Sequence, residues 1–495
     1  MIQALRRSVP SVLSIALLGC LAAAQSPRGS SLEAALDSIK SENIKSDIFF
    51  IASDELGGRD TPSIGQRIAA RFIRARLMRL GVPAGTPDGY FFPYKLYLRQ
   101  LDVFGTKAQA VKSGETMEFR FGRDYAFWPQ GIATSVTSGN VVFCGDATLE
   151  QLGALDLAGK WALCEDNGLK SDERRIIAQK AAAIGLLVGP GPKATDERTA
   201  VRIRDAANSM KRTSVQLDPL KTDTRDNFPS VTISGPAMAG LLGLAGDFDR
   251  VKTRPAIGAD LGVVFTDTRK DNGPEGAVEA ENVCGFWPGS DPALSKEVII
   301  VSAHYDHVGT TAEGVVYNGA DDNGSGTTGL LQLAEALTVH GPLRRSVLLI
   351  WVSGEEKGLY GSKAWCTSPT LPEGHRAICD INIDMIGRNA PDYLLVTPTK
   401  ARPEFYNGLT RLAEALSPKE GFPTLGSADA YWMRSDQVNY ATDLKIPVVF
   451  FFNGEHKDYH KPTDDPDKID CDKIRRVTRL VLRMVDGLQA DKLDL

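Results

Sequence analysis

The sequence predicts an α/β protein with a mixed, largely parallel central sheet, helices on both faces of that sheet, and a smaller inserted α/β domain. Two observations lead to this prediction. From residue 255 onward, short apolar runs typical of buried strands alternate with helical segments, which favours a largely parallel sheet. Residues 106–254 have a different texture, with short strand-like runs between polar or helical segments. A chain of 495 residues is long enough for two or three domains.

The strands of the central sheet are expected where short β-branched and apolar runs occur, at residues 298–303, 347–352, 378–384 and 448–452. Residues 327–339, between the first two strands, place their leucines on one helical face. Ligands of such sheets bind beyond the carboxyl ends of the strands. Side chains at those ends are therefore the first candidates for a functional site.

Residues 31–82 are predicted to be helical, with a helix at residues 68–80 that stops at Gly81. Residues 83–105 are rich in Pro, Gly and Tyr and are expected to become extended. Strands of the insertion are expected at residues 140–144, 160–164, 185–188 and 230–233. Residues 191–227 carry many charges and few large apolar residues, which predicts an exposed excursion. The expected division is a larger domain of residues 31–105 and 255–495, interrupted by an inserted domain of residues 106–254.

Residues 1–24 have the pattern of a secretory signal peptide. Arg6 and Arg7 precede an apolar run from Val9 to Leu21, and three alanines follow as a cleavage region. The run is too short for a membrane span, and no transmembrane span is expected once it is removed. We therefore predict an exported protein, periplasmic or extracellular. The alternative is a lipid-anchored protein, because Leu17-Leu18-Gly19-Cys20 is similar to a lipoprotein cleavage box with Cys20 as the lipidated residue.

The composition is that of an ordinary globular protein, with 42% apolar and 24% charged residues, and the net charge of −5 gives no support to nucleic-acid binding. Six cysteines remain besides Cys20, and an even number in an exported chain permits disulfides. The first candidate pair is Cys144 with Cys164, and the second is Cys366 with Cys379. No Cys-x-x-Cys spacing occurs, which disfavours a thiolate zinc site.

The strand at residues 298–303 ends in His304-Tyr305-Asp306. Alternation along a strand puts His304 and Asp306 on one side. A carboxylate in that position takes one ring N–H of the imidazole and leaves the other nitrogen for a metal ion. Asp321 follows in the loop Gly-Ala-Asp-Asp-Asn-Gly, whose glycines allow a tight turn beside an ion. Alone, this loop is also compatible with a solvated turn or a calcium loop.

The other three central strands also lead into residues that bind metals. Glu355 and Glu356 follow the second strand, Asp384 ends the third, and His460 follows the fourth. Four of the six histidines of the chain fall in the first and last of these motifs. Histidines scattered over a surface would not gather in this way.

Imidazole and carboxylate ligands without thiolate suit zinc in a hydrolytic site, and suit manganese or cobalt less well. One aspartate that bridges two ions, with one His and one acidic ligand for each ion, gives five ligands: His304, Asp321, Glu356, Asp384 and His460. Two Zn²⁺ ions held in this way activate a water molecule and polarise a carbonyl. Glu355 is then free to move the proton.

Residues 297–465 contain five motifs in this order: His-Tyr-Asp, Gly-Ala-Asp-Asp, Glu-Glu, a strand-end Asp and Tyr-His. This ordered set resembles the M28 family of co-catalytic zinc metallopeptidases of the aminopeptidase type. The insertion resembles a protease-associated (PA) domain. The resemblance implies a zinc-exopeptidase fold in which His304 and Asp384 hold one zinc, Glu356 and His460 hold the other, and Asp321 bridges. It also implies Glu355 as the general base, Asp306 behind His304, and a PA-like domain at the site entrance; a spacer is the alternative for that domain.

The remaining polar residues of these motifs have more limited expected roles. Tyr459 is a candidate donor to the developing oxyanion, as in related enzymes, and Arg434 is a candidate contact to the oxyanion or the substrate. His307 is expected to pack or to support a ligand, and Asp322 to stabilise its loop. His456 and Asp458 are expected to structure the last loop, and His340 and His375 to lie on the surface. Gln437 stands where many relatives have a His after Ser-Asp.

These observations predict an exported zinc aminopeptidase that acts on the N-termini of peptides or proteins. A carboxypeptidase or dipeptidase on the same fold is the alternative, and it needs a cationic clamp for a terminal carboxylate, for which Arg434 and Arg388 are candidates. The Glu-Glu pair and the bridging-type loop disfavour a glutaminyl cyclase. The complete ligand set disfavours a non-catalytic binding protein. The sequence sets neither the side-chain preference nor the oligomeric state.

Overall fold

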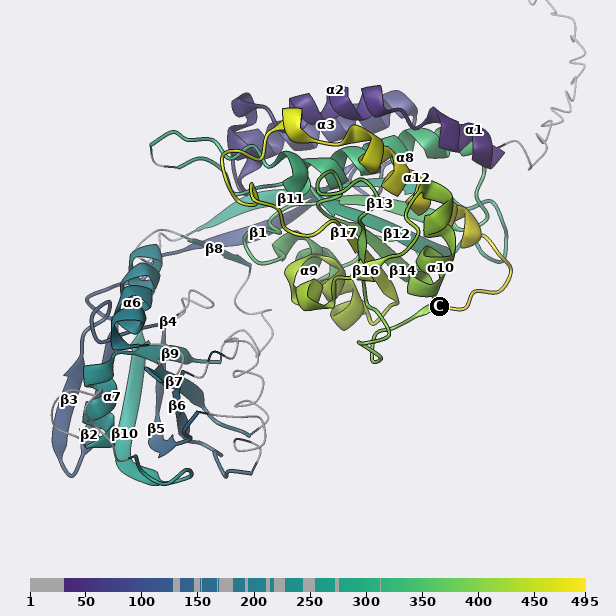
Figure 1. Ribbon diagram of the computed structural model, residues 1–495. Coiled ribbons are helices and arrows are strands. Elements are labelled where there is room, and N and C mark those ends of the chain that lie inside the picture. The colour runs from purple at the N-terminus through teal and green to yellow at the C-terminus, as the bar shows by residue number, and fades with distance from the viewer. Residues whose placement is uncertain are drawn as a thin grey trace, which may run out of the picture.

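The computed structural model describes residues 31–495, except residues 128–133, 147–151, 153, 167, 169–180, 192–194, 211–213, 218–227, 244–253, 272–275 and 312. The predicted signal peptide and Cys20 lie outside the described residues. The chain forms a larger and a smaller lobe, each built on its own sheet (Figure 1). Within the described residues, no helix is both long enough and apolar enough to cross a membrane.

The larger lobe has a nine-stranded mixed sheet in the order β16-β15-β17-β14-β12-β13-β11-β1-β8. Its four central strands run parallel to one another, and they are β12 (Glu297–His304), β13 (Ser346–Val352), β14 (Arg376–Ile383) and β17 (Val448–Phe452). The strands flanking this group are β1 (Phe91–Arg99), β8 (Ser214–Leu217), β11 (Ala277–Trp287), β15 (Leu395–Thr397) and β16 (Gly426–Ser427). The predicted central strands and the parallel arrangement are confirmed.

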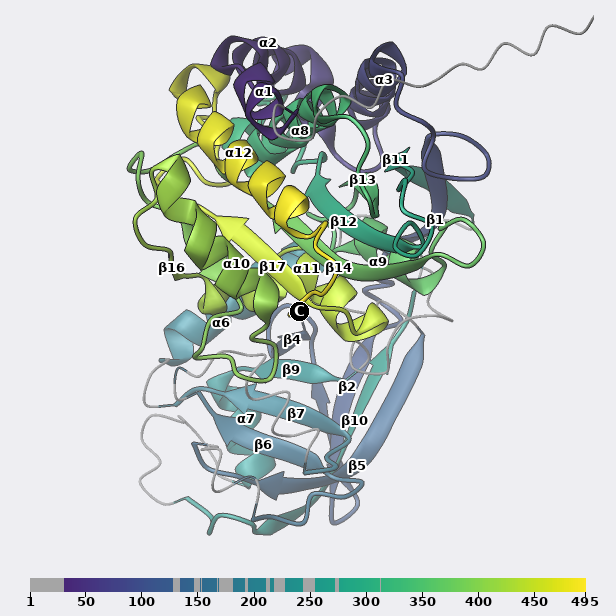
Figure 2. The same cartoon turned by 90° about the vertical axis from the view of Figure 1, so that its right-hand side faces the viewer.

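Helices cover both faces of this sheet, as predicted (Figures 1 and 2). One face packs against α1 (Ser31–Ser38), α2 (Ser41–Ile51), α3 (Ile64–Leu80), α8 (Gly326–His340), α10 (Gly408–Leu416) and α12 (Cys471–Gly487). The other face packs against α9 (Tyr360–Thr367) and α11 (Gln437–Asn439). Alternate residues of β12 enter the two cores, Ile299 and Val301 on the first face and Val298 and Ile300 on the second. Burial on both faces explains why these strands read as continuous apolar runs.

The smaller lobe has an eight-stranded sheet in the order β3-β2-β10-β5-β6-β7-β9-β4 and its own hydrophobic core. Its strands are β2 (Lys107–Lys112), β3 (Glu115–Phe119), β4 (Tyr125–Phe127), β5 (Ser135–Phe143), β6 (Trp161–Glu165), β7 (Gly185–Gly189), β9 (Ser230–Ile233) and β10 (Asp260–Arg269). Among the described residues, its helices are α6 (Asp196–Met210) and α7 (Gly235–Leu242).

Two strands belong to the other sheet than the expected domain boundaries imply. β8 lies within residues 106–254 but pairs antiparallel with β1 at the edge of the larger sheet. β10 lies beyond residue 254 but pairs with β2 and β5 of the smaller sheet. The charged stretch 191–227, predicted to be an exposed excursion, contains both α6 and β8.

The predicted disulfides are wrong: none of the six cysteines from Cys144 to Cys471 forms one. Cys366 and Cys379 belong to the cores on opposite faces of the larger sheet, so the sheet itself separates them. Cys144 and Cys164 pack together with apolar neighbours in a small cluster of the other lobe. These thiols are used as small apolar side chains.

Candidate active site

The parallel strands bring the predicted ligands to one edge of the larger sheet. His304 is the last residue of β12, and Asp384 directly follows β14. Glu355 and Glu356 lie just beyond β13, and His460 lies in the loop after β17. The carboxyl ends of neighbouring parallel strands meet at the same edge. Residues far apart in the chain therefore converge at this edge.

The converging side chains form two groups that share Asp322. In the first group, His304 Nε2 lies 3.2 Å from Asp384 Oδ1 and 3.4 Å from Asp322 Oδ1. In the second group, His460 Nε2 lies 3.0 Å from Asp322 Oδ2 and 3.2 Å from Glu356 Oε2. The two carboxylate oxygens of Asp322 thus face different imidazoles.

This donor set fits metal ions. A neutral imidazole nitrogen has either one proton or one lone pair, so His304 Nε2 and His460 Nε2 cannot each satisfy two carboxylate oxygens by hydrogen bonding. Both nitrogens, together with Asp384 Oδ1, are buried without a hydrogen-bond partner. A cation between each nitrogen and its carboxylates resolves both problems, because buried charges need a partner.

Electrostatics at the second group also favours a cation. Burial alone would lower the pKa of His460, but the carboxylates of Asp322 and Glu356 raise it, to about 10. Burial alone would raise the pKa of Glu356, but its contacts with His307 and His460 hold that pKa well below the usual range. The carboxylates therefore stabilise positive charge at this point.

The position expected of Asp321 is filled by its neighbour Asp322. Asp321 Oδ1 accepts a hydrogen bond from Gly387 N at 2.7 Å, and its Oδ2 lies 3.2 Å from both His456 Nε2 and Asn453 Nδ2. These contacts turn Asp321 toward the loop after β17 and away from both ligand groups. Asp322, expected only to stabilise the loop, lies in both groups.

Asp306 lies behind His304, where it was expected. His304 Nδ1 is 3.2 Å from the Asp306 carbonyl oxygen and 3.7 Å from Asp306 Oδ1. An N–H at Nδ1 that points to Asp306 leaves Nε2 with its lone pair toward Asp384 and Asp322. Asp306 Oδ1 also accepts a hydrogen bond from the backbone N–H of Glu355, which links two strand ends.

His307 lies closer to the second group than expected. Its Nδ1 is 2.9 Å from Glu356 Oε1, and its ring packs edge-on against that of His460. Gly319 leaves the space for this ring, since a Cβ on Gly319 would meet His307 and the Asp322 carbonyl oxygen. His307 thus supports Glu356 directly and is close enough to be grouped with the ligands.

Sequence reasoning missed Arg59, which lies behind the site and is 0% exposed. Its guanidinium donates to the carbonyl oxygens of Ile51, Tyr305, Asn318 and Gly319 at 2.6–2.9 Å. Burial lowers the pKa of Arg59 to about 10, against the opposing effect of Asp306 and Asp322. The signal was the preceding Gly57-Gly58 pair, because a Cβ on Gly58 would collide with the backbone at Gly309 and Tyr317.

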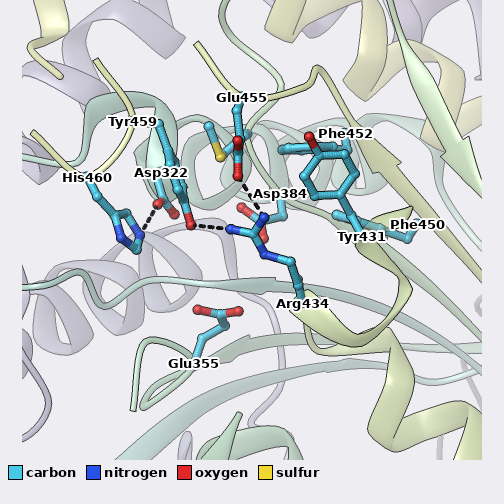
Figure 3. Close-up of a pocket in the computed structure, with 11 residues that line it drawn as sticks. Asp322, Glu355, Asp384, Tyr431, Arg434, Phe450, Phe452, Glu455, Tyr459 and His460 are labelled. Atoms are coloured by element: carbon cyan, nitrogen blue, oxygen red, sulfur yellow. Dashed lines mark hydrogen bonds and ion pairs between the residues drawn. The ribbon is translucent and has the colours of Figure 1, made fainter. Parts of the chain in front are cut away.

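A pocket with about 340 Å³ of empty space opens beside the two groups (Figure 3). Glu355 and Tyr459 line it together with Asp322, Asp384 and His460 of the ligand groups. Burial raises the pKa of Glu355 well above its usual range. An apolar wall is formed by Met385, Tyr431, Phe450 and Phe452. Arg434 lies at the rim, with Nη1 at 2.7 Å from Glu455 Oε1 and Nη2 at 3.0 Å from Tyr459 Oη.

The other predicted residues lie around this pocket or away from it. His456 contacts Asp321, and Asp458 accepts hydrogen bonds from Arg388 and Thr463, as expected for residues that structure a loop. Gln437 accepts a hydrogen bond from Asn382 beneath Asp384. His340 pairs with Asp486, and His375 packs against Phe286; neither histidine belongs to a ligand group.

Residues 282–485 match the sequence model of peptidase family M28. This stretch, the M28 segment, makes up less than half of the chain. The M28 segment contains every residue of the two ligand groups, from His304 to His460.

Two relatives of the chain illustrate the range of similarity. The chain is 28% identical over 300 residues to leupeptin-inactivating enzyme 1 of Streptomyces exfoliatus, which covers 59% of this chain and 60% of that protein. It is 24% identical over 200 residues to a probable leucine aminopeptidase of Arthroderma otae, and this match covers 39% of this chain and 54% of that protein. The chain therefore spans less than two thirds of the length of these curated relatives.

A solved structure, an aminopeptidase from Aneurinibacillus sp. strain AM-1, shares the fold over nearly the whole chain. The TM-score is 0.55 at 19% identity, and the match covers 92% of this chain and 95% of that one. The predicted α/β fold of zinc-exopeptidase type is therefore confirmed.

Proposed function

We propose that this protein is a zinc-dependent aminopeptidase that hydrolyses N-terminal peptide bonds by means of a water molecule activated between two zinc ions. The observation that carries the proposal is Asp322, whose two carboxylate oxygens face different imidazoles beside a pocket that also holds Glu355. The names of the relatives, leucine aminopeptidases among them, agree with this reading.

In the proposed site, His304 and Asp384 would hold one zinc ion, His460 and Glu356 would hold the other, and Asp322 would be a ligand common to both. Nitrogen and carboxylate ligands without thiolate are those of catalytic zinc. When bound, two such ions lower the pKa of a water molecule and polarise a carbonyl oxygen. Asp306 keeps His304 in the tautomer that leaves Nε2 available.

Three features of the chain supply the rest of the chemistry. Glu355 accepts the proton of the attacking water and returns it to the leaving amine. Tyr459 donates a hydrogen bond to the carbonyl oxygen as negative charge develops there. The apolar wall of Met385, Phe450 and Phe452 takes the side chain of the N-terminal residue, so we expect a preference for apolar residues such as leucine.

The carboxypeptidase alternative is less well supported, because both candidate clamps already have carboxylate partners. Arg434 pairs with Glu455, and Arg388 pairs with Asp458 at 2.7 Å. Neither guanidinium is free to hold a substrate carboxylate without breaking an ion pair. A non-catalytic binding role would also leave the half-buried Glu355 beside the ligand groups without a purpose.

The test is hydrolysis of leucine p-nitroanilide before and after chelation, with zinc added back. We expect chelation to abolish activity and Glu355→Gln to lower kcat by about 10²–10⁴-fold, the range for loss of a general base. Glu404→Gln is the matched control, because Glu404 is exposed and its carboxylate pairs with Arg402. Full activity of Glu355→Gln would refute the mechanism. Cleavage of N-acetylated but not of C-terminally amidated peptides would instead indicate a carboxypeptidase.

We also infer export from residues 1–24, and we infer that the smaller lobe is a PA-like insertion that shapes access to the site. The attachment of this lobe through β8, an edge strand of the catalytic sheet, favours a fixed position over a loosely tethered one.

A further inference from the structure

Arg434 makes four contacts at the rim of the pocket (Figure 3). Its two terminal nitrogens reach Glu455 Oε1 at 2.7 Å and Tyr459 Oη at 3.0 Å. Its guanidinium carbon also lies 5.2 Å and 5.7 Å from the ring centres of Tyr431 and Tyr459. With 47% of its side chain exposed, Arg434 is held by these partners rather than by burial.

The hydrogen bond between Arg434 and Tyr459 has only one possible direction. A guanidinium donates and cannot accept, so the tyrosine oxygen must be the acceptor. The hydroxyl proton of Tyr459 then points away from Arg434. Among the described residues no second hydrogen-bond partner of this hydroxyl is found, and it lies in the pocket that Glu355 and Asp322 also line.

Both members of this pair are fixed to the ligand groups. Ser435, the residue after Arg434, is fully buried and donates to Asp384 Oδ2 at 2.8 Å, while accepting from Asn382 Nδ2 at 2.9 Å. The ring of Tyr459 stacks on that of His460, with ring centres 4.0 Å apart. The geometry of the pair is therefore tied to the two sides of the metal site.

We propose that Arg434 is a positioning residue that aims the hydroxyl proton of Tyr459 at the oxygen of the scissile carbonyl. A cation that donates to the tyrosine oxygen also strengthens the O–H as a donor, since hydrogen bonds in a chain polarise one another. The inference rests on the proposed function and extends it: Arg434 acts through Tyr459 and does not bind the substrate. It excludes Arg434 as a clamp for a substrate carboxylate.

A double-mutant cycle with Arg434→Met and Tyr459→Phe tests this inference on leucine p-nitroanilide. We expect Tyr459→Phe to lower kcat by about 10²-fold, at the lower end of the range for an oxyanion donor, and Arg434→Met to lower it by about tenfold with little change in KM. The double variant should be no slower than Tyr459→Phe alone. A further tenfold loss in the double variant, or a loss confined to KM, would overturn the proposal.

A second measurement does not depend on activity. The ¹⁹F resonance of 3-fluorotyrosine at position 459 should shift in Arg434→Met and return toward its original position in Arg434→Lys. Arg402→Met is the matched control, because Arg402 contacts the same short helix, Asp429–Arg434, that contains Arg434. The guanidinium carbon of Arg402 lies 5.2 Å from the ring centre of Trp432, and its Nη2 donates to the Asp429 carbonyl oxygen. An unchanged resonance in Arg434→Met would overturn the positioning role. An enzyme without aminopeptidase activity would instead overturn the proposed function.

Discussion

Asp321 and Asp322 are adjacent and have identical side chains, but their carboxylates contact different groups. Matched substitutions can test this difference. Asp322 faces two imidazoles, whereas Asp321 bonds Gly387, Asn453 and His456. Asp322→Asn should therefore lose most bound zinc, because it removes the carboxylate common to both groups. Asp321→Asn should keep its zinc and lose only about 1–3 kcal/mol of stability through weakened buried hydrogen bonds.

Elemental analysis of the purified variants, with thermal unfolding in parallel, measures both effects. The two variants are matched controls for each other, because they make the same chemical change one residue apart. Loss of zinc from Asp321→Asn with retention by Asp322→Asn would restore the sequence-based assignment.

The sequence alone does not predict which of these two aspartates points toward the ligand groups. The motif predicts that a carboxylate of this loop reaches the site, because glycines let the backbone turn beside the strand end. Which of two neighbours points inward depends on the backbone path, and that path is set by Asp464, whose carboxylate accepts from the N–H groups of both Asp321 and Asp322. Asp464 is 143 residues from Asp321, beyond the reach of a local pattern.

Arg59 is predicted to be a main stabilising residue behind the site. Arg59→Met keeps much of the buried volume but leaves four carbonyl oxygens without their donor and removes a cation near Asp306 and Asp322. We expect a loss of about 3–5 kcal/mol in the free energy of unfolding, as for other buried charges deprived of a partner. Chemical denaturation measures it, and exposed Arg67→Met should change it by no more than about 0.5 kcal/mol. Equal effects of the two changes would contradict the role assigned to Arg59.

At the scale of elements, the sequence predicts the central strands well and the sheet edges poorly. β12, β13, β14 and β17 are buried on both faces, so their apolar runs are unmistakable. β8 is four residues long and lies at an edge. β8 was not predicted, because the sequence around it is charged. An edge strand needs only a few apolar contacts, and Val215 and Leu217 make them here.

The pairing of β8 with β1 predicts how the smaller lobe is held. Leu217 pairs with Leu96 and packs against the core of the larger lobe, so Leu217→Asp would place a charge against that core. We expect β8 to detach and the radius of gyration to increase in small-angle X-ray scattering. Val201→Asp is the control, because Val201 is exposed on α6. If the lobe shapes access to the site, the detached variant should change its preference among long peptides while still hydrolysing leucine p-nitroanilide.

At the scale of the whole molecule, the site gathers several buried or half-buried carboxylates in one place. Asp306, Asp322, Glu356 and Asp384 converge at the edge of the sheet, and burial together with Glu356 raises the pKa of Asp322. Ionising a carboxylate whose pKa is raised costs folding free energy at pH values above that pKa. Bound cations offset this cost, so the stability of the whole fold should depend on metal.

Chelation should therefore lower the Tm of the wild-type protein and not that of Asp322→Asn. Ligand at about a thousand times its Kd stabilises a fold by ~4 kcal/mol, which is lost on chelation. The apo forms should reverse the order of the loaded forms: at pH 8, apo Asp322→Asn should unfold at a higher temperature than apo wild type, because asparagine carries no charge to bury. Because the pKa of Asp322 is raised in the folded state, this advantage should shrink as the pH falls through that pKa and the folded protein takes up a proton at Asp322. Calorimetry of both proteins across this pH range measures the effect, and an apo wild type more stable than apo Asp322→Asn at pH 8 would show that the carboxylates are not under electrostatic strain.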